Sequence, residues 1–269
     1  MKNLFKSHLS LIILVFIAAG LLMTGTVQAE EITFADDNLE AALREEVNID
    51  DSPLTIDDLA DLKWFRPHNS NIESLEGIEQ LKSLERLELQ GNEVEDLSPL
   101  AQLPELKWLN LTDNKVEDLS PLSEVKNLKF LYLKDNKITD ISELAELEEL
   151  MLLDFSGNEV SDITPLSDNK KLSVLIFADN GVENIEPLAE LEKLRALNMN
   201  NNRVRDISSL AKLEDLRSLH FENNLVNDIS PLARLENIRN LGLCRNEVKD
   251  ITPLKDLPNL QRLSPEISG

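Results

Sequence analysis

The sequence of 269 residues contains little cysteine, histidine or aromatic side chain: one Cys, three His and 11 Phe, Trp or Tyr residues. A single cysteine excludes an intrachain disulfide framework and any metal site built from several thiolates. Basic residues are also scarce, because 27 Lys and Arg stand against 50 Asp and Glu and give a formal net charge of −23. This balance argues against nucleic acid and against anionic lipid as partners, since both attract clusters of Lys and Arg. With 42% hydrophobic residues the chain can still bury a core, so its acidity does not indicate disorder.

The first 29 residues contain no acidic side chain. Lys2 and Lys6 precede an apolar run over residues 9–23, and small residues follow as far as Ala29. This pattern predicts a secretory signal peptide over residues 1–29, cleaved after Ala29. The run of about 15 residues is shorter than the roughly 20 that span a bilayer, so an uncleaved anchor is the weaker alternative. We therefore expect a secreted or extracellular surface-associated protein, without a stable membrane anchor after cleavage.

Asparagines recur at a spacing of 22 residues through most of the chain: Asn92, Asn114, Asn136, Asn158, Asn180, Asn202, Asn224 and Asn246. A representative unit reads Leu84-x-x-Leu87-x-Leu89-x-x-Asn92, which is the leucine-rich repeat pattern. We predict an α/β leucine-rich repeat solenoid with a curved parallel sheet on the concave face and 3₁₀ or short helical turns on the convex face. The predicted parts are the signal peptide 1–29, an α-helical N-terminal cap 30–68, the solenoid 69–263 and a C-terminal tail 264–269.

Each residue type in the unit has a predicted structural role. Leu87 and Leu89 alternate with polar residues, so a short strand should point them inward and its other side chains outward. The repeated Asn should turn the chain and satisfy backbone groups of its own coil and of neighbouring coils. Steps such as Ser98-Pro99 recur on the return side of the coil. We expect the hydroxyl to be the N-cap of a short 3₁₀ or helical turn, with Pro at its first position.

An acidic residue stands four positions after the Asn in seven of the eight units: Asp96, Asp118, Asp140, Asp162, Asp206, Asp228 and Asp250, with Asn184 in the remaining unit. A ladder of calcium ions is one interpretation, because hard cations prefer carboxylate oxygens. The other is a loop aspartate that accepts hydrogen bonds from nearby backbone N–H groups. We favour the loop aspartate and predict no metal site.

A solenoid exposes core at its ends, so a cap is required. Apolar residues at helical spacing predict a helix over about 37–47, with acids in its first turn. Thr55 and Asp58 have the spacing of a capping box and predict a second short helix. Trp64 and Phe65 are expected to pack on the first coil.

The cap segments Ile32-Thr33-Phe34-Ala35-Asp36 and 38–43, with units that end in Asp-Ile/Leu-Ser/Thr-Pro-Leu, resemble bacterial internalins over roughly residues 31–263. The resemblance implies a secreted or surface-displayed Gram-positive protein that binds another protein on its concave face. No Leu-Pro-x-Thr-Gly sorting signal follows the repeats. The resemblance is therefore not extended to wall anchoring or host-cell invasion.

Strand positions that alternate with the buried leucines should line the concave face. On four consecutive coils they hold six apolar side chains, which we call the apolar stripe: Trp108, Phe130, Tyr132, Leu152, Val174 and Ile176. At about 4.8 Å per strand the stripe is about 15 Å long, and Trp and Tyr are common anchors of protein interfaces. We predict that it binds a protein ligand, together with Asp154 and His220 at other concave positions. The alternative is that some of these side chains pack sideways and only stiffen the sheet.

Two further functions stay open on the sequence. The acidic surface could bind a basic partner electrostatically, as a scaffold or an inhibitor does. Alternatively, the stripe could join two copies in a homodimer of the cell envelope, with Cys244 as a staple.

Catalysis has little support in the sequence. Among the three histidines only His220 stands at a concave position, with Glu222 two residues along the same strand. No nucleophile, Gly-rich phosphate loop or metal-ligand spacing accompanies this pair. We therefore predict no enzyme activity and no cofactor.

Overall fold

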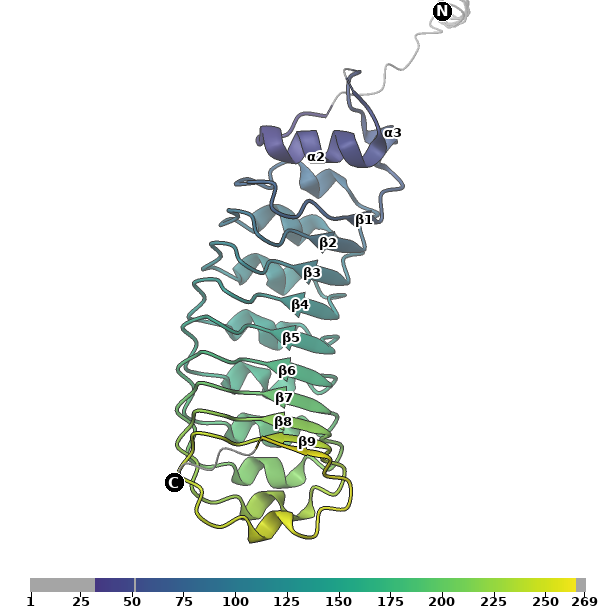
Figure 1. Cartoon of the computed structure of the whole chain (residues 1–269). Coiled ribbons are helices and arrows are strands. Elements are labelled where there is room, and N and C mark those ends of the chain that lie inside the picture. The colour runs from purple at the N-terminus through teal and green to yellow at the C-terminus, as the bar shows by residue number, and fades with distance from the viewer. Residues whose placement is uncertain (1–31, 51, 265–269) are drawn as a thin grey trace, which may run out of the picture.

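The computed structural model describes residues 32–50 and 52–264. The predicted signal peptide 1–29 lies outside the described residues, as does the predicted tail apart from Ser264. Figure 1 shows a stack of similar coils, with two helices packed over its N-terminal end.

Within the described residues, ten strands form one sheet in chain order, and every neighbouring pair is parallel. The strand bounds are β1 Trp64–Phe65, β2 Arg86–Glu88, β3 Trp108–Asn110, β4 Phe130–Tyr132, β5 Leu152–Asp154, β6 Val174–Ile176, β7 Ala196–Asn198, β8 Ser218–His220, β9 Asn240–Gly242 and β10 Arg262–Leu263. Partner residues on adjacent strands are 22 positions apart, as Leu87 and Leu109 are. The sheet register therefore repeats the sequence period, and the predicted solenoid is confirmed.

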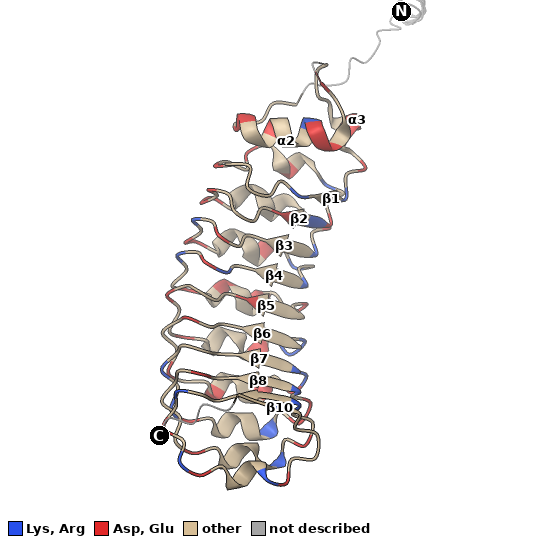
Figure 2. Ribbon diagram, in the orientation of Figure 1, with Lys and Arg blue, Asp and Glu red and all other residues tan. Residues whose placement is uncertain are grey.

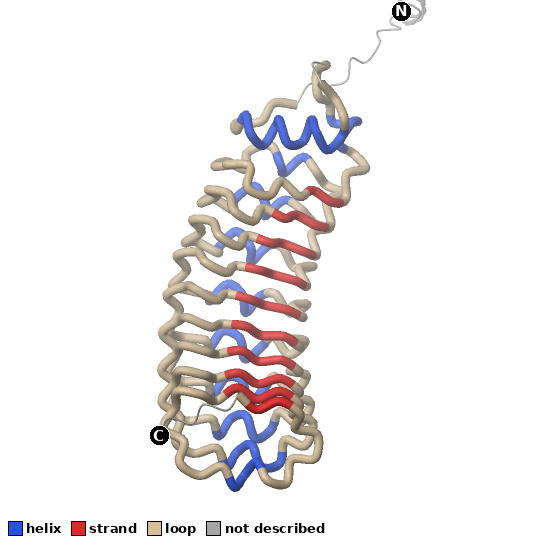
Figure 3. The backbone as a smooth tube through the Cα atoms, in the orientation of Figure 1, coloured by secondary structure: helices blue, strands red, loops and turns tan. Residues whose placement is uncertain are grey.

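Short 3₁₀ helices occupy the side of each coil opposite the strands (Figure 3). Their bounds are η1 Ile78–Gln80, η2 Ser98–Gln102, η3 Ser120–Glu124, η4 Ser142–Glu146, η5 Thr164–Asp168, η6 Glu186–Glu190, η7 Ser208–Lys212, η8 Ser230–Arg234 and η9 Thr252–Leu254. A turn of this tight helix is short enough to fit a 22-residue coil. The sheet and the 3₁₀ helices thus form two layers with the core between them.

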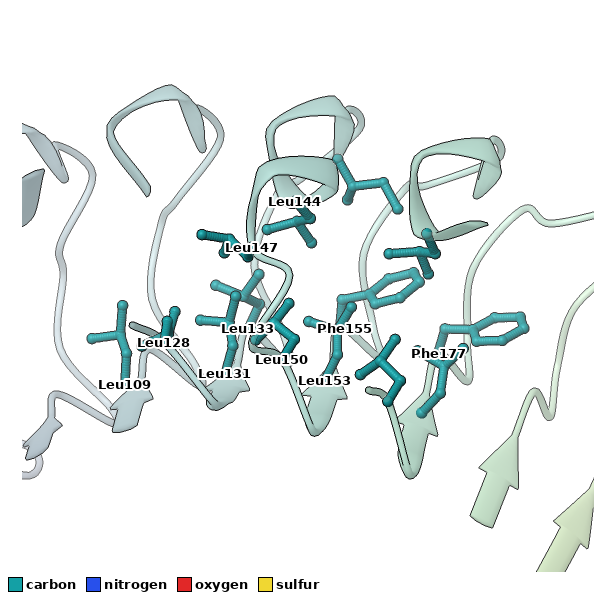
Figure 4. Packing of buried hydrophobic residues seen from close by; sticks show 14 of the residues in the cluster. Leu109, Leu128, Leu131, Leu133, Leu144, Leu147, Leu150, Leu153, Phe155 and Phe177 are labelled. Atoms are coloured by element: carbon teal, nitrogen blue, oxygen red, sulfur yellow. The ribbon is translucent and has the colours of Figure 1, made fainter. Parts of the chain in front are cut away.

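The core is a set of apolar columns that run along the stack. Leu87 and Leu89 are fully buried, and the equivalent residues of the following coils are buried with them as far as Leu241 and Leu243 (Figure 4). In the column that contains Leu89, Phe155 and Phe177 stack with ring centroids 5.6 Å apart and planes within 10° of parallel. Each such side chain contributes about 1.5–3 kcal/mol on burial, so the repeated leucines hold neighbouring coils together.

The repeated asparagines bond to the backbone as predicted. Asn114 Oδ1 accepts a hydrogen bond from Val94 N at 3.0 Å, and its Nδ2 donates to the carbonyl oxygens of Leu89 and Leu111. All eight asparagines make the same three kinds of contact. They satisfy backbone groups that would otherwise be unpaired inside the bend.

The 3₁₀ helices at the Ser/Thr-Pro steps start one residue earlier than predicted. The residue that caps η2 is Leu97, and Ser98 is already the first residue of the helix. The carboxylate of Asp96 accepts hydrogen bonds from Ser98 N at 2.8 Å and Ser98 Oγ at 2.6 Å. The predicted hydroxyl N-cap was therefore wrong, because Ser98 already lies inside the helix and both its N–H group and its hydroxyl bond to the Asp96 carboxylate.

The loop-aspartate interpretation is confirmed in all eight units. A side-chain oxygen accepts the N–H group two residues later in each case, with Asn184 serving Glu186 where the aspartate is replaced. For Asp96 and Asp162, hydrogen bonds from the following hydroxyl residue lower the pKa of the carboxyl. These side-chain hydrogen bonds thus hold the first residue of each of these 3₁₀ helices in place.

Both predicted helices of the cap are present. Helix α2 spans Asp37–Val47 and buries Leu39 and Leu43, while α3 spans Ile56–Leu59. The Asp58 carboxylate accepts hydrogen bonds from the backbone N and the hydroxyl of Thr55. This contact fixes the entry into α3.

The predicted packing of Trp64 and Phe65 is half right. Phe65 is 1% exposed, but Trp64 is 61% exposed and does not pack into the first coil. The two residues form β1, which pairs with β2 in the register Trp64–Arg86. Successive side chains of a strand point to opposite faces, so one residue enters the core and the other faces out. The sheet thus begins at Trp64, inside the segment assigned to the cap.

Candidate protein-binding surface

The strand register places all eight predicted binding residues in two adjacent columns of the concave face. The first column holds Trp108, Phe130, Leu152 and Val174, and the second holds Tyr132, Asp154, Ile176 and His220. All eight are half-buried, whereas the leucine between the two columns on each strand is buried. The apolar stripe is therefore one continuous patch, contributed by strands β3 to β6.

Three aromatic side chains of the stripe form a cluster. The Trp108 ring centroid lies 4.7 Å from that of Phe130 and 5.3 Å from that of Tyr132, with tilted planes in both pairs. Such distances lie within the favourable range for aromatic pairs. The predicted alternative of sideways packing thus describes these rings correctly, although each keeps part of its surface exposed. The contacts hold a half-exposed aromatic surface in a fixed shape.

The cluster continues toward the cap through two residues that the sequence analysis left out of the stripe. Arg86 places its guanidinium carbon 4.0 Å from the centroid of the Trp108 ring. Trp64 is the neighbour of Arg86 on the other side, in the same column of the sheet. The repeat period could have identified Trp64, because it precedes Trp108 by two repeats of 22 residues. The exposed indole of Trp64 extends the patch to the first strand.

Polar groups surround the aromatic cluster. Burial raises the pKa of the Tyr132 phenol, the nearby carboxylates of Asp154 and Glu88 add to this effect, and Arg86 opposes it. The phenol is therefore neutral over the physiological range. Asp154 accepts hydrogen bonds from the backbone N and the hydroxyl of Ser156, which orient its carboxylate. Inside the cluster, Trp108 Nε1 is buried and has no hydrogen-bond acceptor among the described residues.

His220 does not belong to the aromatic cluster. It lies on β8, four strands beyond Tyr132 on β4, or about 19 Å at 4.8 Å per strand. Its Nδ1 atom lies 3.4 Å from Glu222 Oε1, and the second carboxylate oxygen of Glu222 is buried without a partner among the described residues. Gly242 on β9 gives this pair room, because a Cβ atom there would overlap the Glu222 carboxylate. The structure thus separates an aromatic half of the face from a polar half.

The described residues hold no group of three or more His, Cys, Asp or Glu side chains that could bind a metal ion. None of the helices in residues 32–50 and 52–264 combines the length and the apolar character needed to cross a membrane. The arrangement that stands out on this surface is the aromatic patch, whose chemistry suits binding of another macromolecule.

A family model for leucine-rich repeats (two copies) matches residues 104–146 and 192–234. No curated protein gave a sequence match. Among solved structures, the leucine-rich repeat ectodomain of the plant receptor kinase GASSHO1/SCHENGEN3 from Arabidopsis thaliana, in complex with Casparian strip integrity factor 2, is similar in fold alone. It has 22% identity and a TM-score of 0.66, over 71% of this chain and 25% of that chain.

Two bacterial structures are more similar. Internalin C2 from Listeria monocytogenes has 29% identity and a TM-score of 0.73, over 88% of this chain and 99% of that chain. The internalin InlF from the same organism has 33% identity and a TM-score of 0.83, over 86% of this chain and 68% of that chain. The repeats, the helical cap and this level of identity over most of both chains all indicate the same family. The chain belongs to the internalin family of leucine-rich repeat proteins.

Proposed function

We propose that this protein is a non-enzymatic interaction module that captures a protein partner on its concave face. The observation that carries the proposal is the aromatic cluster of Trp108, Phe130 and Tyr132, held half-exposed by mutual contacts and by Arg86. Trp, Tyr and Arg are the residue types most enriched among the energetic hot spots of protein interfaces. The internalin fold supports this class of function.

The fixed shape of the cluster favours binding. A side chain that is already ordered loses little conformational entropy when a partner covers it, whereas each flexible side chain costs about 0.5–1.5 kcal/mol. The Trp108 ring contacts two aromatic rings and a guanidinium group, so little of its freedom is left to lose. A partner that covers the remaining exposed surface would therefore gain apolar burial at low entropic cost.

We further propose that the protein acts outside the cell, secreted or associated with the surface. The support is the pattern of residues 1–29, with two lysines, an apolar run and small residues before Ala29. Mass determination of the exported protein tests this proposal. A mature chain that starts at Glu30 is expected, and a chain that keeps its first 29 residues would contradict cleavage.

Capture of the partner is the test of the binding surface. The native protein and a Trp108→Ala/Tyr132→Ala variant are immobilised and exposed to conditioned medium and candidate cell surfaces. We expect the variant to lose about 1–3 kcal/mol of binding free energy per side chain. The matched control is Asn198→Ala/Ser218→Ala, which changes the same columns on β7 and β8 and should retain capture. Equal capture by the native protein and the aromatic variant would contradict the proposal.

Two other modes of association predict different results. An acidic surface that binds a basic partner would lose capture between low and high salt, because exposed charges are screened within about 10 Å at 0.1 M. Binding through the apolar stripe would persist in high salt. Homodimerisation through the stripe would double the mass measured by light scattering, with sensitivity to reductant if Cys244 joins the two copies.

A further inference from the structure

Charge is unevenly distributed along this acidic chain. Residues 30–192 contain 40 acidic and 13 basic side chains, whereas residues 193–269 contain 10 acidic and 12 basic side chains. The C-terminal coils are therefore close to neutral, while the coils before them carry the net negative charge. Figure 2 shows Lys and Arg beside the strands of these last coils.

Three arginines of the C-terminal coils form a row at one edge of the concave face. Arg195, Arg217 and Arg239 immediately precede β7, β8 and β9. The backbone N–H group of Arg217 donates to the carbonyl oxygen of Arg195 at 2.8 Å, and Arg239 bonds to Arg217 in the same way. The three residues are therefore direct neighbours on adjacent coils, spaced by about 4.8 Å. We call them the arginine row.

The guanidinium groups of the arginine row are exposed and unpaired. Within residues 32–50 and 52–264, none of them forms an ion pair or a side-chain hydrogen bond. Near the cap, in contrast, the cations of the same column are paired: Glu85 forms ion pairs with Lys63 at 3.3 Å and with Lys107 at 2.9 Å. No acidic residue stands in this column from β5 onward. Three adjacent cations without a partner are thus specific to the C-terminal coils.

The neighbouring concave positions leave the row accessible. Ala196, Ser218 and Asn240 follow the three arginines, and each has a short side chain that cannot cover a guanidinium group. Glu192, Glu214 and Glu236 lie three residues earlier in each coil, yet none of them comes within 4 Å of the arginines as an ion pair. The next strand adds another exposed cation, Arg262, in register with Asn240.

We propose that the arginine row binds a short, extended acidic segment of the protein partner. Each guanidinium is a planar fork that fits a carboxylate through two hydrogen bonds. The row is about 10 Å long, which equals three extended residues at about 3.3 Å each. Because successive side chains of an extended chain point to opposite sides, a run of about four or five Asp or Glu residues presents two or three carboxylates to the row.

The charge distribution favours a short acidic peptide over a long polyanion. A sulfated polysaccharide that occupied the row would extend over the coils before it, where 40 acidic side chains repel it. A short acidic segment stays on the neutral coils, and the rest of the partner contacts the apolar stripe. The inference rests on the proposed function only in assigning this segment to the same partner.

The test uses a fluorescein-labelled hexaglutamate peptide as the probe, with hexaglutamine and a heparin hexasaccharide for comparison. Binding is measured by fluorescence anisotropy at 0.1 M salt, where the Debye length of about 10 Å screens the distant acids. We expect hexaglutamate to bind and hexaglutamine not to bind. Substitution of all three arginines by Ala should weaken the affinity for hexaglutamate about tenfold. Substitution by Lys should weaken it about twofold to threefold, because the charge remains and the fork is lost.

The matched control is Arg205→Ala/Lys212→Ala/Arg234→Ala, which removes the same charge from exposed positions outside the row. This variant should bind hexaglutamate within twofold of the native protein. Equal loss in both triple variants, no binding of hexaglutamate, or binding of the heparin fragment alone would overturn the proposal. The Trp108→Ala/Tyr132→Ala variant should retain hexaglutamate binding. Its partner capture therefore tests the proposed function separately.

Discussion

The guanidinium carbon of Arg86 lies 4.0 Å from the centroid of the Trp108 ring, and the two residues are partners across strands β2 and β3. This contact joins the exposed Trp64 at the cap to the aromatic cluster on β3 and β4. Arg86 also forms an ion pair with Glu88 on its own strand, which holds the guanidinium over the ring. The proposed binding surface is thus ordered from two sides, by aromatic rings and by a paired cation.

Removal of this cation should loosen the cluster. A cation over an aromatic face is worth about 0.5–1 kcal/mol at an exposed site. We expect Arg86→Ala to lower the free energy of unfolding by about that amount and to change the fluorescence of Trp108. Arg66→Ala, which removes an exposed arginine next to β1, is the control. Unchanged stability and fluorescence in Arg86→Ala would show that the stacking contributes nothing.

The cap depends on Asp36, whose two carboxylate oxygens have different partners. One oxygen accepts hydrogen bonds from Asn38 N and Leu39 N at the start of α2. The other accepts from Glu73 N at 2.7 Å and Ser74 N at 3.1 Å in the first coil. An asparagine can keep the oxygen that caps the helix, but its amide nitrogen cannot accept the bonds from the coil. We expect Asp36→Asn to speed hydrogen exchange in α2 and Asp36→Ala to cost about 2 kcal/mol.

The same carboxylate makes the cap sensitive to acid. Burial by itself would raise the pKa of Asp36, but four backbone N–H donors outweigh burial and hold the pKa below its usual value. A carboxyl with a lowered folded-state pKa adds stability that is present above its unfolded pKa of about 3.9. This stability is lost as the pH falls through the folded-state pKa. The protection of the α2 amides, corrected for the intrinsic exchange rate at each pH, should therefore fall below about pH 3.9, and Asp36→Asn should show a smaller change.

Asn169 interrupts an apolar column of the core. It occupies the position that Leu147 and Leu191 hold in adjacent coils, and it is fully buried. Its amide nitrogen donates to the carbonyl oxygens of Leu144 and Leu147, but its side-chain oxygen has no partner among the described residues. Both carbonyl groups already accept backbone N–H bonds. We expect Asn169→Leu to raise the free energy of unfolding by about 1 kcal/mol, because the unpaired polar atom is removed. Denaturant unfolding measures the change, and a loss of stability would contradict this account.

Arg245 has a left-handed backbone, with φ of 55°. Equivalent positions of the other coils hold Gly, Asp or Asn, which tolerate this conformation better. We expect Arg245→Asn to raise the free energy of unfolding by about 0.5–1 kcal/mol through relief of strain. The control is Arg205→Asn, which removes an arginine charge at a position without positive φ and should be neutral. Equal effects in both variants would assign the gain to charge.

Much of the fold followed from the sequence because its causes are local and repeated. The 22-residue spacing of Asn92 and its equivalents fixed the length of each coil, and alternation around Leu87 fixed which side chains enter the core. The two cap helices followed from apolar spacing and capping residues. The members of the stripe followed as well, because side chains in the same position of successive units must lie side by side.

The tertiary structure decided what depends on contacts between coils. Phe65 rather than Trp64 enters the core because β1 joins the sheet in the register that pairs Trp64 with Arg86. Ser98 is the first residue of η2 rather than its N-cap, and the Asp96 carboxylate accepts its N–H group across the turn before the helix. The stacking of Arg86 on Trp108 and the unpaired arginine row depend on side-chain directions that a period of 22 cannot specify. The sequence by itself determined the repeat and its faces, and packing between coils determined the shape and charge of the surface.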